Sequence, residues 1–207
     1  MMIHPWDAAR DDTEWQQWLA AHDFGHLAVN GQGGEPPWVQ PTHFLYDAGR
    51  SEVLLHLARP NPLWRALEAD PRVTLSVADD YAFIPDPWQA EPGTPTEHGT
   101  PTTYYTAVQL HCTAHVIDDP DAKSALLERQ LAHFQPEGGS APLSAPPLRR
   151  MLPGLRGLRL EVTSVRAKFK YGGKRSQEVR DRVADLLTTR DGPRDTRVRE
   201  HVVRRGT

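Results

Sequence analysis

The segment His56-Leu-Ala-Arg-Pro-Asn-Pro62 holds side chains that could bind a phosphate group. An apolar, strand-like run ends in Arg59, and a helical pattern follows it directly, with Pro62 at its first position. An arginine side chain can bind two phosphate oxygens, and the free N–H groups at the start of a helix favour an anion. A purely structural interpretation also fits, in which Asn61 caps the helix and Arg59 is a surface charge.

Other side chains with possible chemistry give weaker signals. His111 and His115 are four residues apart, which in a strand places them about 13 Å from each other, too far to share a metal ion. Cys112 points to the opposite face and fits a small packed hydrophobic residue better than a nucleophile. Lys174 lacks the upstream glycine of a P-loop, and no serine occupies a nucleophile elbow. The sequence therefore predicts no metal site and disfavours the common nucleotide-binding folds.

Size and composition indicate one main core. The chain has 207 residues, of which 38% are apolar and 25% charged, with 19 prolines and 15 glycines, as in a loop-rich globular protein. No apolar run is long enough to span a membrane, and Met1 to Trp6 lacks the features of a signal peptide. We therefore expect a cytoplasmic protein without a membrane partner. The single cysteine, Cys112, excludes an internal disulfide.

Charge is unevenly distributed along the chain. The net charge is −3, but Arg166 to Thr207 carries thirteen Lys and Arg against six Asp and Glu, a net of +7, which leaves −10 for Met1 to Val165. A basic tail of this kind can contact nucleic acid or a phosphate-bearing ligand. It can equally pair with the acidic remainder of the same chain, and the sequence leaves both interpretations open.

Periodicity and turn residues predict the elements that position these side chains. Thr13 to His22 and Asn61 to Ala69 have apolar residues at helical spacing behind capping candidates. Four apolar runs separated by turn formers predict strands: His26 to Asn30, Trp38 to Tyr46, Val53 to Ala58 and Arg72 to Ala78. Gly31 to Pro37 and Asp47 to Ser51 have the residue types of hairpin turns, which favours antiparallel pairing.

The second half of the chain contains longer elements. Only the first half of Tyr81 to Trp88 can form a strand, because prolines interrupt the rest. We predict long strands over Thr103 to Ile117 and Leu155 to Phe169, helices over Asp121 to Phe134 and Gln177 to Leu187, and an irregular linker over Gly138 to Pro147. Six or seven strands joined mostly by hairpins, with helices inserted between them, predict an antiparallel barrel or sandwich of the α+β class.

The chain resembles the PaiB family of FMN-binding negative transcriptional regulators over most of its length. The most specific part is the spaced set His56-x-Ala-Arg-x-Asn-Pro62, preceded by Pro41-Thr-His-Phe44. Further matching positions are Ala28-Val-Asn-Gly31, Trp64, Leu67, Ala82-Phe-Ile84, Trp88, Pro101-Thr102, Tyr105, Ala107, Val108, Asp118-Asp119, Gly157, Lys168-Phe-Lys170 and Arg175. The resemblance implies an antiparallel split β-barrel with inserted and flanking helices, similar to the pyridoxamine-phosphate oxidase-like flavoproteins. It also implies a homodimer that holds FMN at the subunit interface. We expect the barrel to span residues 1–175 and a basic C-terminal helix and tail to span residues 176–207.

The same resemblance implies which side chains contact the cofactor. It assigns the FMN phosphate to Arg59, helped by Asn61 and by Lys170 or Arg175, and it places Thr42, His43 and His56 on the strands that line the flavin. Thr102 and Tyr105 would come from the long strand of the second subunit. These types fit, because FMN needs cations for its phosphate, polar groups for the flavin edge and apolar walls for its rings. His43 and His56 could instead be core histidines, and Tyr105 could serve packing.

This sequence departs from the family pattern at three places. Thr103-Tyr104 stands where the family has Trp-Asn, and Gly172-Gly173-Lys174 stands where it has Ser-Gln-Asn. Pro85 to Gln89 replaces a Ser-Pro-Ser-Trp-Tyr-like stretch. The two glycines either remove cofactor contacts or let backbone N–H groups approach the phosphate, with Lys174 adding charge.

Three functions are compatible with the sequence. The first is an FMN-binding negative regulator, whose contact with DNA would depend on the basic C-terminal segment because no helix-turn-helix pattern is visible. The second is a flavin-dependent oxidoreductase of the split-barrel class that acts on a small substrate, although no dedicated acid or base stands out. The third is a flavin-binding module without catalysis or contact with DNA.

Overall fold

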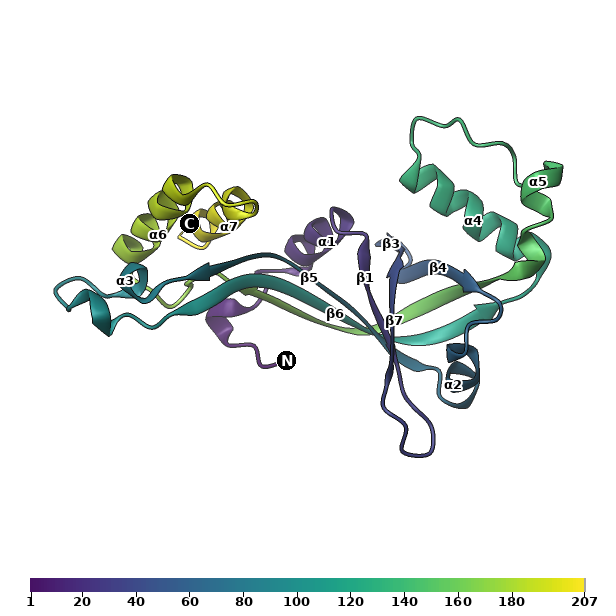
Figure 1. Ribbon diagram of the computed structural model, residues 1–207, viewed down its shortest axis with the longest axis horizontal. Coiled ribbons are helices and arrows are strands. Elements are labelled where there is room, and N and C mark those ends of the chain that lie inside the picture. The colour runs from purple at the N-terminus through teal and green to yellow at the C-terminus, as the bar shows by residue number, and fades with distance from the viewer. Residues whose placement is uncertain (207) are drawn as a thin grey trace. The chain divides into compact units, whose positions relative to one another are not determined.

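The computed structural model describes residues 1–206. Within these residues, seven strands form one sheet in the order β2-β1-β5-β6-β7-β4-β3 (Figure 1). The strands are β1 (Phe24–Val29), β2 (Trp38–His43), β3 (Leu45–Asp47), β4 (Glu52–Ala58), β5 (Arg72–Ile84), β6 (Thr102–Ile117) and β7 (Leu155–Lys170). The helices are α1 (Asp12–Ala20), α2 (Leu63–Ala69), α3 (Asp86–Gln89), α4 (Pro120–Phe134), α5 (Pro146–Arg149), α6 (Gln177–Arg190) and α7 (Asp195–Arg204). None of the helices among the described residues is long and apolar enough to cross a bilayer.

The chain divides into two compact units, each of which is described by itself. The barrel unit comprises Gln16–Val77 and Gln109–Val165, and the terminal unit comprises Met1–Trp15, Ala78–Val108 and Arg166–Thr207. The sequence-based division after residue 175 stays a prediction.

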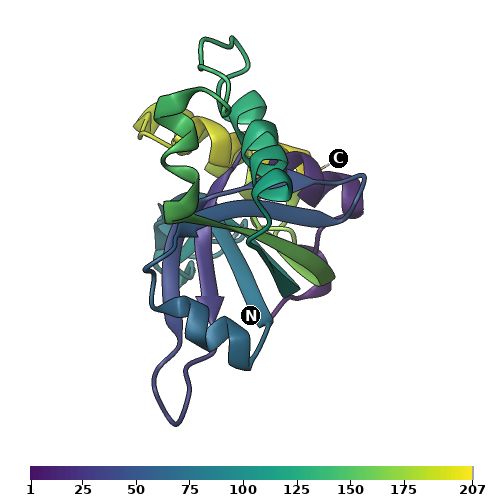
Figure 2. The same cartoon turned by 90° about the vertical axis from the view of Figure 1, so that its right-hand side faces the viewer.

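The barrel unit closes because the two edge strands of its sheet are neighbours in sequence. β2 ends at His43 and β3 begins at Leu45, so only Phe44 separates the two edges. Phe44 is buried, and its N–H donates a hydrogen bond to the carbonyl oxygen of Asp23 (2.9 Å). Figure 2 faces this unit and shows its strands curving around a common interior. The prediction of one continuous strand from Trp38 to Tyr46 is therefore wrong, since the chain must pass from one edge to the other at Phe44.

Both predicted hairpins are present. β1 pairs antiparallel with β2 from Phe24↔His43 to Val29↔Trp38, and the turn between them contains Gly33 and Gly34 at positive φ. β3 pairs antiparallel with β4, and β4 pairs antiparallel with β7 along its whole length. This pairing places Thr42, His43 and His56 on two strands whose positions are set by backbone hydrogen bonds.

Helix α4 is anchored on the barrel unit by an apolar face. The side chain of Asp119 caps the helix by accepting a hydrogen bond from Ala122 N (2.8 Å), and Pro120 opens the first turn. Leu126 and Leu127 then pack with Leu54 in a buried cluster. The predicted helix is thus confirmed, with its start one residue earlier than expected.

The terminal unit contains a helix that the sequence did not reveal. α6 ends at Arg190, a four-residue turn with Asp191 at positive φ (49°) follows, and α7 then begins at Asp195 (Figure 1). The sequence did not predict α7 because most of its residues are charged. Its only buried apolar or aromatic side chains are those of Val198, His201 and Val202. α6 and α7 are thus two helices joined by a short turn that contains Gly192. The expectation that the chain has no DNA-binding helix-turn-helix motif stays a prediction.

The basic tail pairs with carboxylates of its own unit. Arg194 Nε lies 3.0 Å from Asp79 Oδ1, and Arg205 Nη2 lies 3.2 Å from Glu14 Oε2. Arg190 and Asp195 share a bidentate pair with two 2.6 Å contacts. Of the two interpretations of the tail's charge, these contacts support pairing within the chain.

Candidate functional site

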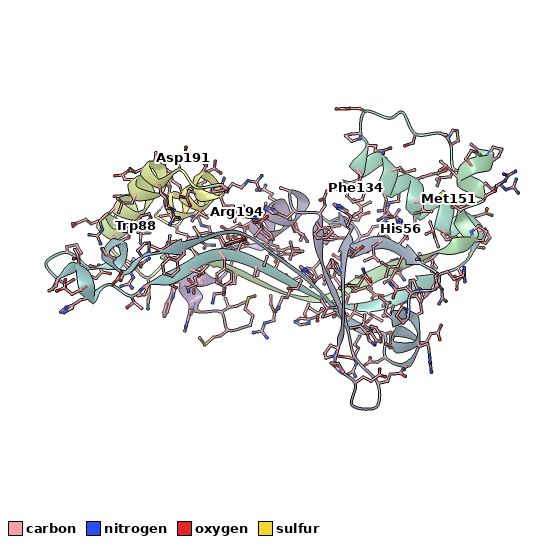
Figure 3. All side chains as sticks on the ribbon, in the orientation of Figure 1. His56, Trp88, Phe134, Met151, Asp191 and Arg194 are labelled. Carbon is pink, nitrogen blue, oxygen red and sulfur yellow. The ribbon has the colours of Figure 1, made fainter. Side chains whose placement is uncertain are left out.

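The barrel unit has an apolar cavity of about 990 Å³ beside α4, here called the α4 cavity. Figure 3 shows His56, Phe134 and Met151 around this space. Thr42, His43 and His56 come from β2 and β4, and the rest of the wall comes from α4 and the segment after it. The lining residues are Thr42, His43, His56, Leu127, Gln130, Leu131, Phe134, Gln135, Ser140, Ala141, Leu143, Pro147, Leu148, Met151, Leu152 and Leu155. The three residues that the resemblance assigned to the flavin thus border one cavity.

Helical spacing explains how α4 contributes its wall. Leu127, Leu131 and Phe134 lie four and seven residues apart, so their side chains share one face of the helix. Gln130 lies on the same face and is 4% exposed. The result is an apolar wall with one polar side chain in it.

Gln130 links α4 to two residues of β4, Leu54 and His56, through two hydrogen bonds. Its Nε2 donates to the carbonyl oxygen of Leu54 (3.2 Å), and its Oε1 lies 2.7 Å from His56 Nδ1. Gln130 was not identified from the sequence, where it appears as an ordinary polar position of a helix. Only its place one turn from the apolar positions of α4 could have pointed to it.

Thr42 and His43 complete the polar side of the α4 cavity. Thr42 is 8% exposed, and its hydroxyl donates to the carbonyl oxygen of His43 (2.9 Å). The ring of His43 packs edge-on against Phe134, with centroids 5.3 Å apart, and its Nδ1 lies 3.7 Å from Asp23. His43 is therefore a partly exposed histidine at the cavity's rim, and the core-histidine alternative does not describe it.

The terminal unit has a second, charged pocket of about 280 Å³, here called the basic pocket. Its lining residues are Met2, His4, Trp6, Asp7, Gln89, Thr100, Thr102, Tyr104, Lys168, Lys170, Gly172, Gly173, Lys174 and Arg175. Among these described residues, four are cations and one is a carboxylate. Thr102, Lys170 and Arg175, all assigned to the cofactor by the resemblance, therefore lie around one pocket. Lys174, which was expected to add charge near the phosphate, lines the same pocket, and Lys168 is an addition that the structure supplies.

The cations of the basic pocket are not fully neutralised. Lys170 Nζ donates to Thr102 Oγ1 (2.5 Å), while Lys168 Nζ lies 3.9 Å from Asp7. Burial, together with the positive charges of Lys168 and Lys174, lowers the pKa of Lys170 from its ordinary value. Burial in turn raises the pKa of Asp7, and nearby lysines oppose that shift. Like charges held together in this way favour an anionic ligand.

The two glycines of the basic pocket are required by close packing. Gly172 has φ +74°, and a side chain there would overlap the hydroxyl of Tyr104. A side chain at Gly173 would overlap the carbonyl oxygen of Trp6. The Gly-Gly-Lys departure thus removes two side chains from the pocket wall and adds the charge of Lys174.

Arg59 and Asn61 lie in the barrel unit at the start of α2. Arg59 Nη2 pairs with Asp118 (2.9 Å), and its Nε donates to the carbonyl oxygen of Pro153 (2.7 Å). Asn61 Oδ1 accepts from Leu63 N (3.1 Å), as the capping interpretation expected. Neither residue lines the α4 cavity. Their assignment to the phosphate stays a prediction.

Tyr105 lies near two lysines of the basic pocket, and Cys112 is buried. The ring of Tyr105 lies 5.6 Å from Lys168 Nζ and 5.8 Å from Lys170 Nζ, so it accompanies the cations of the basic pocket. Cys112 is 3% exposed, and burial raises the pKa of its thiol to about 12. A buried thiol of such high pKa fits the predicted packing role.

Comparisons with known proteins agree with this fold. Residues 1–164 match the family model described as "Putative FMN-binding domain". The protease synthase and sporulation protein PAI 2 of Bacillus subtilis (strain 168) is 23% identical over 175 residues, which cover 83% of this chain and 82% of that protein. Among solved structures, the flavocytochrome Anf3 of Azotobacter vinelandii has a TM-score of 0.62 at 20% identity, over 81% of this chain and 71% of that one. The FAD and heme binding protein of Mycobacterium smegmatis has a TM-score of 0.61 at 19% identity, over 80% and 74%. These likenesses confirm the predicted α+β split-barrel fold.

Proposed function

Because the chain belongs to the FMN-binding domain family, as its resemblance to PaiB proteins predicted, we propose that it binds FMN as a homodimer and acts as a negative transcriptional regulator. The family match and the fold both support a flavin-binding split barrel. We propose three further points: that the flavin is FMN, that the protein is a dimer, and that it regulates transcription.

The basic pocket carries this proposal. Phosphate oxygens would give the lysines charge-assisted hydrogen bonds and remove their mutual repulsion. Thr102 Oγ1 accepts from Lys170, which leaves the hydroxyl proton of Thr102 available to a phosphate oxygen. Arg175 adds a guanidinium, although its Nη1 also lies 3.3 Å from Glu91. The residues present therefore fit the phosphate end of FMN.

We propose that each flavin takes its ring contacts from one subunit and its phosphate contacts from the partner. Thr42, His43 and His56 border the α4 cavity, and the resemblance assigns Thr102 and Tyr105 to the second subunit. A homodimer supplies both sets to each of two flavins.

Apolar exposure supports association of two copies. The edge strand β2 exposes Trp38 (39%) and Val39 (59%), and Phe24 on β1 is 50% exposed. Exposed apolar side chains on an edge strand, such as Trp38 and Val39 on β2, are typical of interaction surfaces.

The first test is the flavin content and mass of the purified protein. We expect a yellow protein whose heat-released ligand has the mass of FMN, and a dimer by light scattering. The protein stripped of ligand is then titrated with FMN, FAD and riboflavin, and FMN should bind most tightly because the basic pocket holds one phosphate group. A protein that binds none of the three would refute the proposal, and a preference for FAD would correct the identity of the flavin.

The second test separates a regulator from an oxidoreductase. A regulator retains DNA fragments with an affinity that falls as salt rises, since lysine and arginine contacts to phosphates release counterions. Deleting the tail is unsuitable, because Val198 and Val202 of α7 are buried. Arg199→Glu, at an exposed position of α7, should weaken retention and leave FMN binding unchanged. Absence of retention, together with bleaching by a nicotinamide donor and reoxidation by a small substrate, would identify an oxidoreductase instead.

A further inference from the structure

We propose that the α4 cavity is the subsite for the isoalloxazine ring and that His56 Nε2 recognises the ring by accepting a hydrogen bond from its N3–H. Gln130 acts as the positioning residue that gives His56 the required tautomer. This inference rests on the proposed function and adds to it the residue that forms a hydrogen bond with the edge of the ring.

The tautomer of His56 follows from a chain of two hydrogen bonds. The carbonyl oxygen of Leu54 can only accept, so the group of Gln130 that faces it at 3.2 Å must be the amide NH₂. Gln130 therefore presents Oε1, which can only accept, to His56 Nδ1 at 2.7 Å. Nδ1 must carry the proton, and in the neutral ring Nε2 then has a free lone pair.

This lone pair belongs to a side chain that borders an apolar space. The side chain of His56 is exposed on β4 and lines the α4 cavity, while the strand residues on either side of it, Leu55 and Leu57, are buried. Within the described residues 1–206, Nε2 of His56 makes no hydrogen bond. A ligand that fills the cavity must offer this nitrogen a donor, because an acceptor left unpaired in an apolar site is destabilising.

The chemistry of the cavity matches the ring of a flavin and excludes its phosphate. No lysine or arginine is among the described residues that line the cavity, so an anionic group has no partner there. A volume of about 990 Å³ and walls of leucine, methionine and phenylalanine suit a flat aromatic ring system. Oxidised isoalloxazine carries one ring N–H, at N3, and otherwise presents acceptors along its polar edge. The donor that His56 requires is therefore N3–H.

The test compares FMN with 3-methyl-FMN, which keeps the phosphate and loses the N3–H. Ligand-free wild-type protein, His56→Phe, Gln130→Leu and the control His26→Phe are titrated with both compounds by quenching of flavin fluorescence. His26 is an exposed histidine of β1 outside the α4 cavity, so its replacement matches the change at position 56. Thermal unfolding of each variant shows that it is folded.

We expect wild type and His26→Phe to bind FMN at least about tenfold more tightly than 3-methyl-FMN, since 1.4 kcal/mol corresponds to tenfold. The ratio should fall to about one in His56→Phe and should decrease in Gln130→Leu, where the tautomer is no longer imposed. Equal affinities in wild type, or a ratio that survives in His56→Phe, would overturn the inference while FMN binding itself stands. If wild type binds neither compound, the proposed function has failed as well.

Discussion

Replacing Lys170 by glutamine should lower the preference of the protein for FMN over riboflavin. Lys170 Nζ is partly buried beside Thr102 Oγ1 at 2.5 Å, and it lies in the basic pocket with Lys168 and Lys174. A hydrogen bond to a charged partner contributes about 1.5–3 kcal/mol, which corresponds to about 10- to 150-fold in affinity. FMN affinity should fall by that factor, and riboflavin affinity should stay unchanged because riboflavin has no phosphate.

The same substitution should not weaken the ligand-free fold. Burial and neighbouring lysines lower the pKa of Lys170 in the folded protein, so its charge opposes folding at every pH below that pKa, and stability rises as the pH approaches the unfolded value. Glutamine removes that charge and keeps a donor for Thr102. The assay is fluorescence titration with both flavins, and Arg199→Gln serves as the matched loss of one surface charge in the same unit. An FMN-to-riboflavin ratio equal to that of wild type would refute the phosphate assignment. The ratio measured for Arg59→Ala tests the sequence-based role of that arginine in the same way.

Three further outcomes follow from the geometry. Gly172→Ala should lower the free energy of unfolding by about 1–3 kcal/mol in chemical denaturation, because its φ of +74° disfavours a side chain and the new methyl group would meet Tyr104. Asp195→Asn should cost about 2 kcal/mol at pH 7, because the hydrogen bonds from Arg190 lower the pKa of that carboxyl. Its stabilisation is fully present above the unfolded pKa near 4, so the difference should decrease below that pH and vanish as the pH falls through the lower pKa of the folded protein. Cys112, with its thiol pKa raised to about 12, should react with iodoacetamide at pH 8 about a thousandfold more slowly in folded than in unfolded protein, and rapid labelling of folded protein would contradict its burial.

Local patterns in the sequence predicted most of the fold. The hairpin turns, the strand from Val53 to Ala58 and the helix from Asp121 to Phe134 all depend on short-range signals, and all are present. The break at Phe44 was missed because both sides of it have strand-forming residues, and only closure of the barrel requires a turn there. α7 was missed because it buries few side chains and is otherwise charged.

Only those residues of the candidate site that the family resemblance identifies could be predicted from the sequence. The resemblance named Thr42, His43 and His56 together, and the structure brings them to one cavity. Gln130 could not be predicted, since its role depends on the position of Leu54, 76 residues earlier in the chain. Such pairings arise from packing of α4 on the barrel, and no spacing in the sequence reports them.

The departure from the family pattern at residues 172–174 changes the side chains that line the basic pocket. Where the usual motif offers three polar side chains, this chain has two glycines that lie against Tyr104 and Trp6, followed by Lys174. Neutral side chains hold a phosphate through fixed hydrogen bonds, whereas lysines hold it mainly through charge. In the proposed complex, we expect the basic pocket to distinguish phosphorylated from unphosphorylated flavins and the ring end to distinguish flavins from other phosphate-bearing ligands. That is the end at which His56 Nε2, with its tautomer imposed by Gln130, requires a donor.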